Sequence, residues 1–144
     1  MINFELVTLK GVALREQVYE VLLPTPQGQI AVFDNHAPLV STTAHGIVFV
    51  RKQANHPDDM LESYAVNAGG VIDIGDNTVR VLVDEADHSS DIDEKEAAEA
   101  YERAKKLASE ARDKQSLDEA LSAIDRQAVR LKVAELRRHR RHKM

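Results

Sequence analysis

The 144-residue chain contains no cysteine and no tryptophan, and aromatic residues make up only 4% of it. The absence of cysteine excludes disulfide bridges and thiolate chemistry, and it leaves the redox compartment undetermined. No apolar run approaches the roughly 20 residues of a membrane-spanning helix, and residues 1–10 lack the basic and apolar segments of a secretory signal. We therefore expect a chain that is soluble, or peripheral to another body, with a mainly aliphatic core.

Charge is distributed unevenly along the chain, whose formal net charge is −5. Residues 84–99 contain eight acidic residues and one lysine, whereas residues 126–144 contain eight basic residues and one glutamate. If these two segments lie on antiparallel helices, acidic side chains face basic ones and partly neutralise them. Each exposed ion pair of this kind would stabilise the hairpin by only about 0 to 1 kcal/mol.

The first 84 residues show the alternating apolar pattern and the turn signals of short β-strands. Turns are indicated by Gly, Pro and Asn at residues 55–58, 68–70 and 75–77. Many short strands at this spacing predict a β-sandwich or a β-barrel. We expect strands at residues 3–10, 17–23, 29–33, 46–52, 60–67, 71–74 and 78–84.

Beyond Asp91 the apolar period changes to that of two helices whose contact positions step by three and four residues. Asp91 or Asp93 is expected to cap the first helix, and Ser116 with Glu119 to form a capping box at the second. The expected seam is Ala97, Tyr101, Ala104, Ala108 and Ala111 against Leu117, Leu121, Ile124, Ala128 and Leu131.

Because this seam is rich in alanine, each contact buries little apolar area, and the helix pair should be only marginally stable alone. The predicted fold is therefore a two-part α+β chain. Residues 1–86 form an N-terminal antiparallel β-sandwich domain, and residues 87–144 form a C-terminal antiparallel helical hairpin.

No set of residues in the sequence assembles a catalytic or metal site. No Ser or Cys nucleophile pattern accompanies His36, so a turn role is favoured. The acidic residues around Asp87 lack the EF-hand spacing, and Gly69-Gly70 lacks a phosphate-loop pattern, so a solvated linker and a tight strand connection are favoured. The basic C-terminus lacks interleaved aromatics for base stacking, so an acidic protein partner or a solvated tail explains it at least as well as nucleic acid.

The segment 28–39, GQIAVFDNHAPL, resembles the G-x-x-G-[IV]-x-P-[GN]-H-A-P-L segment of the ε subunits of F-type ATP synthases. Residues 4–8, 68–74 and 78–86 are similar to further family segments and occur in the same order. The resemblance therefore spans essentially the whole chain. Ala31 stands where the family usually has Gly, and Asp34 where it usually has Pro or Ala, so contacts of this loop are not transferred in detail.

The resemblance implies a central-stalk rotor subunit that couples proton transport to ATP synthesis and restrains ATP hydrolysis through its C-terminal helices. It implies no catalysis and no cofactor. The expected partners are the γ subunit and the c-ring, with His36 and Pro38 in the loop near the ring, and the catalytic β subunits. The expected location is the cytoplasmic face of the cell membrane, reached only through the complex. Arginines expected to contact the acidic segment of β are Arg126, Arg130, Arg137, Arg138, Arg140 and Arg141.

Some members of the resembled family also bind a regulatory ATP through an [IL]-D-x-x-R-A pattern. Asp93 matches this pattern, but Glu96 stands at its arginine position. The remaining candidate residues are Arg103, Arg126 and Arg130. Because Glu96 places negative charge near phosphate, a cost that can exceed about 1 kcal/mol, ATP binding is expected to be weak or absent.

Two other classes of function remain open at this point. A freestanding nucleotide sensor predicts that the isolated chain changes shape with ATP. A nucleic-acid-binding adaptor that uses the basic tail predicts a steep salt dependence of binding. The resemblance along the chain favours the rotor subunit over both.

Overall fold

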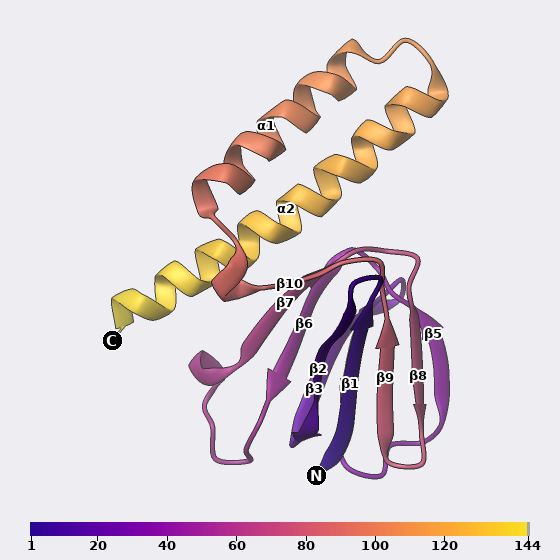
Figure 1. Cartoon of the computed structure of the whole chain (residues 1–144), viewed down its shortest axis with the longest axis vertical. Coiled ribbons are helices and arrows are strands. Elements are labelled where there is room, and N and C mark those ends of the chain that lie inside the picture. Colours follow the sequence, from indigo (N-terminus) through magenta and orange to yellow (C-terminus); the bar gives the residue numbers. More distant parts are fainter. Residues whose placement is uncertain (144) are drawn as a thin grey trace. The chain divides into compact units, whose positions relative to one another are not determined.

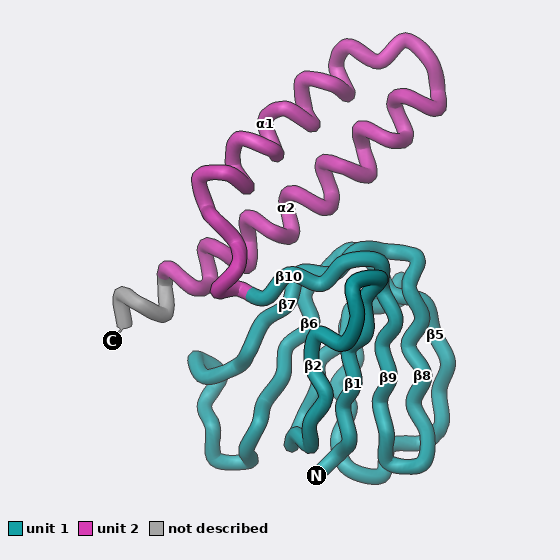
Figure 2. The backbone as a smooth tube through the Cα atoms, in the orientation of Figure 1, with its two compact units in different colours: residues 1–88 teal, residues 89–144 magenta. Residues whose placement is uncertain are grey.

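The computed structural model in Figure 1 describes the backbone of residues 1–143 and the side chains through Arg138. The chain divides into two compact units, Met1–His88 and Ser89–Met144, which are coloured separately in Figure 2. The first unit contains the strands and the second contains the long helices. The boundary expected between residues 86 and 87 falls inside the last strand of the first unit.

The first unit contains two five-stranded sheets, with strand orders β2-β1-β9-β8-β5 and β10-β7-β6-β3-β4. All neighbouring strands are antiparallel except β1 and β9, which are parallel. The predicted β-sandwich is therefore confirmed, with one parallel pair added. The strands are β1 Ile2–Thr8, β2 Gly11–Val18, β3 Glu20–Thr25, β4 Gly28–Val32, β5 Leu39–Thr42, β6 Gly46–Arg51, β7 Glu62–Val66, β8 Val71–Gly75, β9 Thr78–Leu82 and β10 Ala86–His88, with the short 3₁₀ turn η1 Asp58–Met60 before β7.

The sandwich core forms because alternate residues of the strands are apolar. In β1, Ile2, Phe4 and Leu6 are buried, while Asn3 lies exposed between them. Side chains alternate across a strand, so one face of each sheet supplies the core. The core also contains Val18, Val21, Leu23, Val32, Val48, Val50, Tyr64, Val66, Ile72, Ile74, Val79, Val81 and Val83.

The strand prediction was wrong between residues 11 and 23 and incomplete elsewhere. The single strand expected at 17–23 is two strands, β2 and β3, that meet at Tyr19. Strand β2 is exposed over its first three residues and alternates only near its end, and β5 is a short, mostly exposed edge strand. Both are defined by backbone pairing, β2 with β1 and β5 with β8. Strand β10 was missed because it has only three residues.

The connection between β7 and β8 is built around Gly69 and Gly70. Gly69 has a φ of +88°, a conformation that glycine adopts without steric cost. A Cβ on Gly70 would lie 2.3 Å from the backbone oxygen of Leu82 and 2.9 Å from Oγ1 of Thr43. The buried Thr43 hydroxyl donates to the oxygen of Asn67 and accepts from the N–H of Gly70. The predicted tight strand connection is confirmed.

The second unit begins with the 3₁₀ turn η2, Ser89–Asp91, and continues with α1, Glu94–Glu110, and α2, Lys114–Lys143. Asp93 caps α1, as predicted, because its side chain accepts from the N–H of Glu96 at 3.0 Å. Asp113 accepts from the N–H of Ser116 at 2.7 Å, and this hydrogen bond lowers the pKa of Asp113. The predicted cap at Ser116 was therefore wrong, because α2 begins two residues earlier.

The helix seam is confirmed in α1 but partly wrong in α2. Ala97 and Ala104 are buried as expected. In α2, Leu117 and Leu121 are 39% and 46% exposed and Ala128 is exposed. The buried seam positions Ala120, Gln127 and Ala134 instead repeat every seven residues. Ala97 and Ala104 in α1 have the same spacing of seven residues. The two helices therefore contact each other through these residues and not through Leu117 and Leu121.

Candidate functional site

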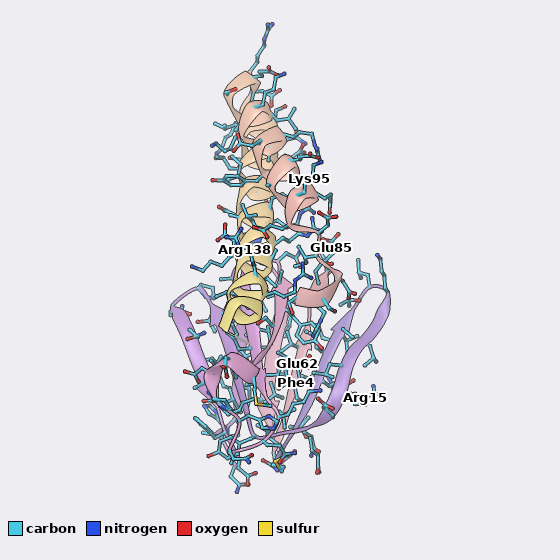
Figure 3. The ribbon with its side chains drawn as sticks, turned by 90° about the vertical axis from the view of Figure 1, so that its left-hand side faces the viewer. Phe4, Arg15, Glu62, Glu85, Lys95 and Arg138 are labelled. Carbon is cyan, nitrogen blue, oxygen red and sulfur yellow. The ribbon has the colours of Figure 1, made fainter. Side chains whose placement is uncertain are left out.

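The base of the hairpin joins the acidic and basic segments of the sequence. Arg130 Nη2 lies 3.4 Å from Glu96 Oε2, and Arg138 Nη1 lies 2.8 Å from Glu94 Oε1. Figure 3 labels Arg138 among the side chains of this unit. The prediction that the acidic start of the first helix faces the basic end of the second is confirmed.

Arg137 lies in the same region but binds backbone oxygens. Its guanidinium donates to the carbonyl oxygen of Ser89 and, at 2.8 Å, to that of Ile92. Both of these residues are buried, Ile92 almost completely. Sequence reasoning assigned Arg137 to a partner surface and missed this contact, because no local pattern links positions 45 residues apart.

The four candidate nucleotide-binding residues have separate positions in the hairpin. The Asp93 carboxylate caps α1, Arg103 is exposed on α1, and Arg126 is exposed on α2. Arg130 donates to Gln127 at 2.9 Å and also pairs with Glu96. Glu96, which replaces the arginine of the resembled pattern, thus interacts with one of the remaining cationic candidates.

Two further candidates for partner contact, Arg140 and Arg141, have side chains outside the described residues. Their backbone belongs to α2. Within the described part of the chain, neither helix combines the length and the apolar character that crossing a membrane requires. The described residues also contain no group of three or more His, Cys, Asp or Glu side chains placed to hold a metal ion.

The loop between β4 and β5 contains the candidates His36 and Pro38. The Nδ1 atom of His36 lies 2.7 Å from the oxygen of Ala37, and Pro38 is exposed. Asn35 has a φ of +57°, and its N–H donates to Asn77 Oδ1 at 3.0 Å. The loop is therefore held by the turn that joins β8 to β9, and the contact of His36 is with the backbone of the next residue, which fits a turn role.

Next to this loop lie exposed aromatic side chains that sequence reasoning did not select. Phe33 is 42% exposed and Tyr19 is 37% exposed, and their rings meet edge to face with centroids 5.8 Å apart. Exposed apolar surface of this kind marks candidate contact sites when it is contiguous. The sequence alone does not show whether an apolar side chain at the end of a strand, such as Phe33, is buried or exposed to solvent.

The outer face of sheet β2-β1-β9-β8-β5 carries a second exposed apolar row. Val12, Val7, Leu82, Val71 and Thr42 are successive cross-strand neighbours across all five strands. Val12, Leu82 and Val71 are between 41% and 49% exposed. The row becomes apparent only once strand register is known, because its members are scattered along the sequence.

A charged row follows the apolar row on the same face. Glu5 is paired with Arg15 at 2.9 Å and with Arg80 at 3.6 Å. The hydrogen bond from Arg15, with the positive charges of both arginines, holds the pKa of Glu5 below its usual value. The face therefore combines apolar and charged groups, as protein–protein contact surfaces do.

Charged side chains elsewhere on the sandwich form ion-pair clusters with a structural role. Lys52 pairs with Glu16 at 3.0 Å and with Glu62 at 3.6 Å, and His88 Nε2 lies 2.6 Å from Glu62 Oε2. Partial burial favours a raised pKa at Glu62, but the hydrogen bond with His88 and the charge of Lys52 outweigh it, so the pKa is lowered. The cluster holds β10, β7 and β2 together, and it contains no nucleophile.

The family model and the relatives that match this chain all describe the same kind of protein. Residues 1–89 match the family model described as the β-sandwich domain of the ATP synthase delta/epsilon chain. The chain is 38% identical over 120 residues to the chloroplastic ATP synthase epsilon chain of Oltmannsiellopsis viridis, covering 83% of this chain and 87% of the relative. It is 32% identical over 140 residues to the ATP synthase epsilon chain of Herpetosiphon aurantiacus, covering 96% and 98%.

A solved structure supports the fold at lower identity. A chain in the OSCP/F1/c-ring structure of the Euglena gracilis mitochondrial ATP synthase superposes with a TM-score of 0.77 at 22% identity. The similarity covers 92% of this chain and 80% of that one. At this sequence identity, the superposition shows that the two chains share a fold and shows nothing more.

Proposed function

Because this chain belongs to the family of ATP synthase epsilon chains, we propose that it is a non-catalytic central-stalk subunit whose C-terminal hairpin restrains ATP hydrolysis. The β-sandwich attaches the subunit to the rotor, and the hairpin is the regulatory arm. In this role the chain turns with the stalk and helps couple proton transport to ATP synthesis. Its place is at the cytoplasmic face of the cell membrane, reached through the complex.

One observation carries the regulatory part of the proposal: the basic end of α2 is engaged within the closed hairpin. Arg130 and Arg138 are paired with glutamates, and Arg137 binds backbone carbonyls. Separation of α2 from the start of α1 would release these arginines from their present partners for an acidic partner. The two states of the arm therefore differ in the positive charge that they present, which gives a partner a differential affinity for the open state.

The attachment part of the proposal rests on the sandwich surfaces. The apolar row that includes Val12, Leu82 and Val71, with the charged row around Glu5, is suited to contact with the γ subunit. The loop that contains His36 and Pro38, with the exposed ring of Phe33 beside it, is suited to contact with the c-ring. Catalytic β subunits with an acidic segment would contact the arginines of α2 by charge complementarity.

The direct test is ATP hydrolysis by the cognate catalytic α-β-γ complex with either the full-length chain or a version that ends at Asp91. The shorter version retains the whole sandwich unit, Met1–His88. We expect both versions to bind, and only the full-length chain to inhibit, by a severalfold decrease in hydrolysis rate. Binding is measured by cosedimentation, so that a loss of inhibition is separated from a loss of attachment.

Two outcomes of this experiment would count against the proposal in different ways. Equal inhibition by both versions would place the restraint in the sandwich and remove the regulatory role of the hairpin. Failure of both versions to bind would contradict the stalk assignment itself.

Nucleotide binding is expected to be weak or absent, although Asp93, Arg103, Arg126 and Arg130 are at the positions that the resembled pattern indicates. The physical reason is Glu96, whose carboxylate pairs with Arg130 and would repel phosphate. Titration calorimetry of the full-length chain with ATP should therefore show no saturation at micromolar nucleotide. A Glu96→Arg variant, which restores the pattern, should bind more tightly, and saturable micromolar binding by the unmodified chain would contradict the expectation.

A further inference from the structure

The two helices of the hairpin differ in length, and this leaves a distinct structure at its base. Helix α2 has 30 residues and α1 has 17. Arg130 pairs with Glu96 and Arg138 pairs with Glu94, the first residue of α1, so this part of α2 reaches the start of α1. Arg137, in the same part of α2, lies beside the segment 89–93, which includes the 3₁₀ turn η2. The base is therefore closed by a helix against a non-helical segment.

Arg137 makes the specific contact at this base. Its guanidinium donates to the carbonyl oxygens of Ser89 and Ile92, which bracket the turn. Ser89 is 8% exposed and Ile92 is 1% exposed. Buried carbonyl groups require hydrogen-bond donors, and a guanidinium offers several N–H groups in a rigid fork that can serve two oxygens at once. One side chain thus joins residues that lie 45 and 48 positions away in the chain.

The ion pairs between the two helices hold the base less firmly than these hydrogen bonds. The Arg138–Glu94 pair and the Arg130–Glu96 pair each include a side chain that is more than half exposed, and exposed ion pairs contribute little because water screens them. The seam between the helices consists mainly of alanine, which buries little area, and the larger buried side chains of this unit, Ile92 and Val133, make apolar contacts that have no preferred direction. Leu107, Leu117 and Leu121, which would bury more, are exposed. The forked hydrogen bonds of Arg137 are therefore a strong directional contact at the base.

We propose that Arg137 is the lock of the hairpin, and that its two hydrogen bonds to the segment 89–93 control how readily α2 separates from α1. When these bonds break, two buried carbonyls lose a donor, which makes opening unfavourable until water or a new position of the segment satisfies them. Loss of the arginine removes this cost from the opening step. The population of open hairpin then rises.

The consequence for regulation rests on the proposed function. A partner that offers carboxylates to Arg137 competes with the two carbonyls and so favours the open arm. Substitution of Arg137 removes both the lock and one of the charges that the partner would bind. The opening itself is a property of the isolated chain, and it is measurable without the complex.

The test uses distance measurement in the full-length chain, which has no native cysteine to interfere with labelling. Lys95→Cys on α1 and Lys132→Cys on α2 place spin labels at two exposed positions near the base. Distance distributions are then recorded by electron double resonance for the parent, Arg137→Gln and Arg137→Lys. Arg138→Gln is the matched control, since it removes the same charge from the adjacent, exposed position.

The expected result is a rise of about tenfold or more in the ratio of open to closed distances for Arg137→Gln, as the loss of charge-assisted hydrogen bonds implies. Arg137→Lys should also open the hairpin. Lysine retains the positive charge, but it lacks the planar guanidinium that donates to two carbonyl oxygens at once. The control should change the ratio by less than about twofold. Far-ultraviolet circular dichroism should show the same helix content in Arg137→Gln and the parent, because the lock predicts separation of an intact α2, and melting of α2 would count against it.

Two results of the distance measurement would overturn the inference. One is an unchanged distance distribution in Arg137→Gln, and the other is an equal change in Arg138→Gln, which would assign the effect to net charge. Hydrolysis assays with the same variants in the α-β-γ complex separate this inference from the proposed function. Opening without any effect on hydrolysis would retain the lock and remove its regulatory consequence.

Discussion

Replacement of Gly70 with alanine is expected to lower the unfolding free energy of the β-sandwich by about 3 kcal/mol. The added Cβ would lie 2.3 Å from the backbone oxygen of Leu82 and 2.7 Å from a methyl carbon of Val83. A backbone oxygen in a paired strand cannot rotate away as a side chain can, so the connection between β7 and β8 must move. Urea unfolding followed by tyrosine fluorescence, to which the core residue Tyr64 contributes, measures the loss.

Gly75→Ala is the matched control for this substitution. Gly75 ends β8, its φ lies outside the left-handed region, and an added Cβ there meets nothing within 4 Å. Its effect should stay within about 0.5 kcal/mol. If the two variants unfolded at the same urea concentration, steric conflict would not be the reason for glycine at position 70.

Phe4→Ala should lower the unfolding free energy of the sandwich by about 3 to 5 kcal/mol. Phe4 is 1% exposed and lies in β1, which is paired on both sides, with β2 and with β9. Removal of its ring leaves a cavity that the neighbouring strands cannot fill, because their positions are fixed by backbone hydrogen bonds. The same urea titration measures the change.

Phe33→Ala tests whether burial, and not aromatic character, causes this loss. Phe33 is 42% exposed, and its ring contacts that of Tyr19 at the surface. The cost should be no more than about 1 kcal/mol. A cost at Phe33 equal to that at Phe4 would show that the core does not depend on the buried ring as proposed.

The sequence was most informative where a local pattern and the tertiary packing agree. The alternation of Phe4, Leu6 and Thr8 predicted a strand at residues 3–10, and Asp91 or Asp93 was predicted to cap α1, which Asp93 does. In both cases the neighbouring residues determine the local structure, by side-chain alternation in one and by a capping hydrogen bond in the other. The prediction of the β-sandwich followed from several such segments and the turns between them.

Other features depended on contacts between distant positions and were not predictable in this way. Strand β2 is recognised by its pairing with β1, and the exposed apolar row exists only once the register of five strands is fixed. The seam of α2 was misplaced because Leu117 and Leu121 are more apolar than the buried Ala120 and Gln127. Helix packing there favours small side chains that let the backbones approach. Among the candidate site residues, the position of Arg137 was the least predictable.

The parallel pairing of β1 with β9 also has a consequence for biosynthesis. Phe4 lies opposite Val79, so β1 pairs with a strand that is synthesised much later than itself. The β1–β2 hairpin can form early, but its open edge has no partner until β9 has been made. A contact over this separation folds slowly, and an unpaired edge is prone to association with other chains. During translation, therefore, the N-terminal strand is the segment that most needs protection, although in the finished sheet it lies between two neighbours.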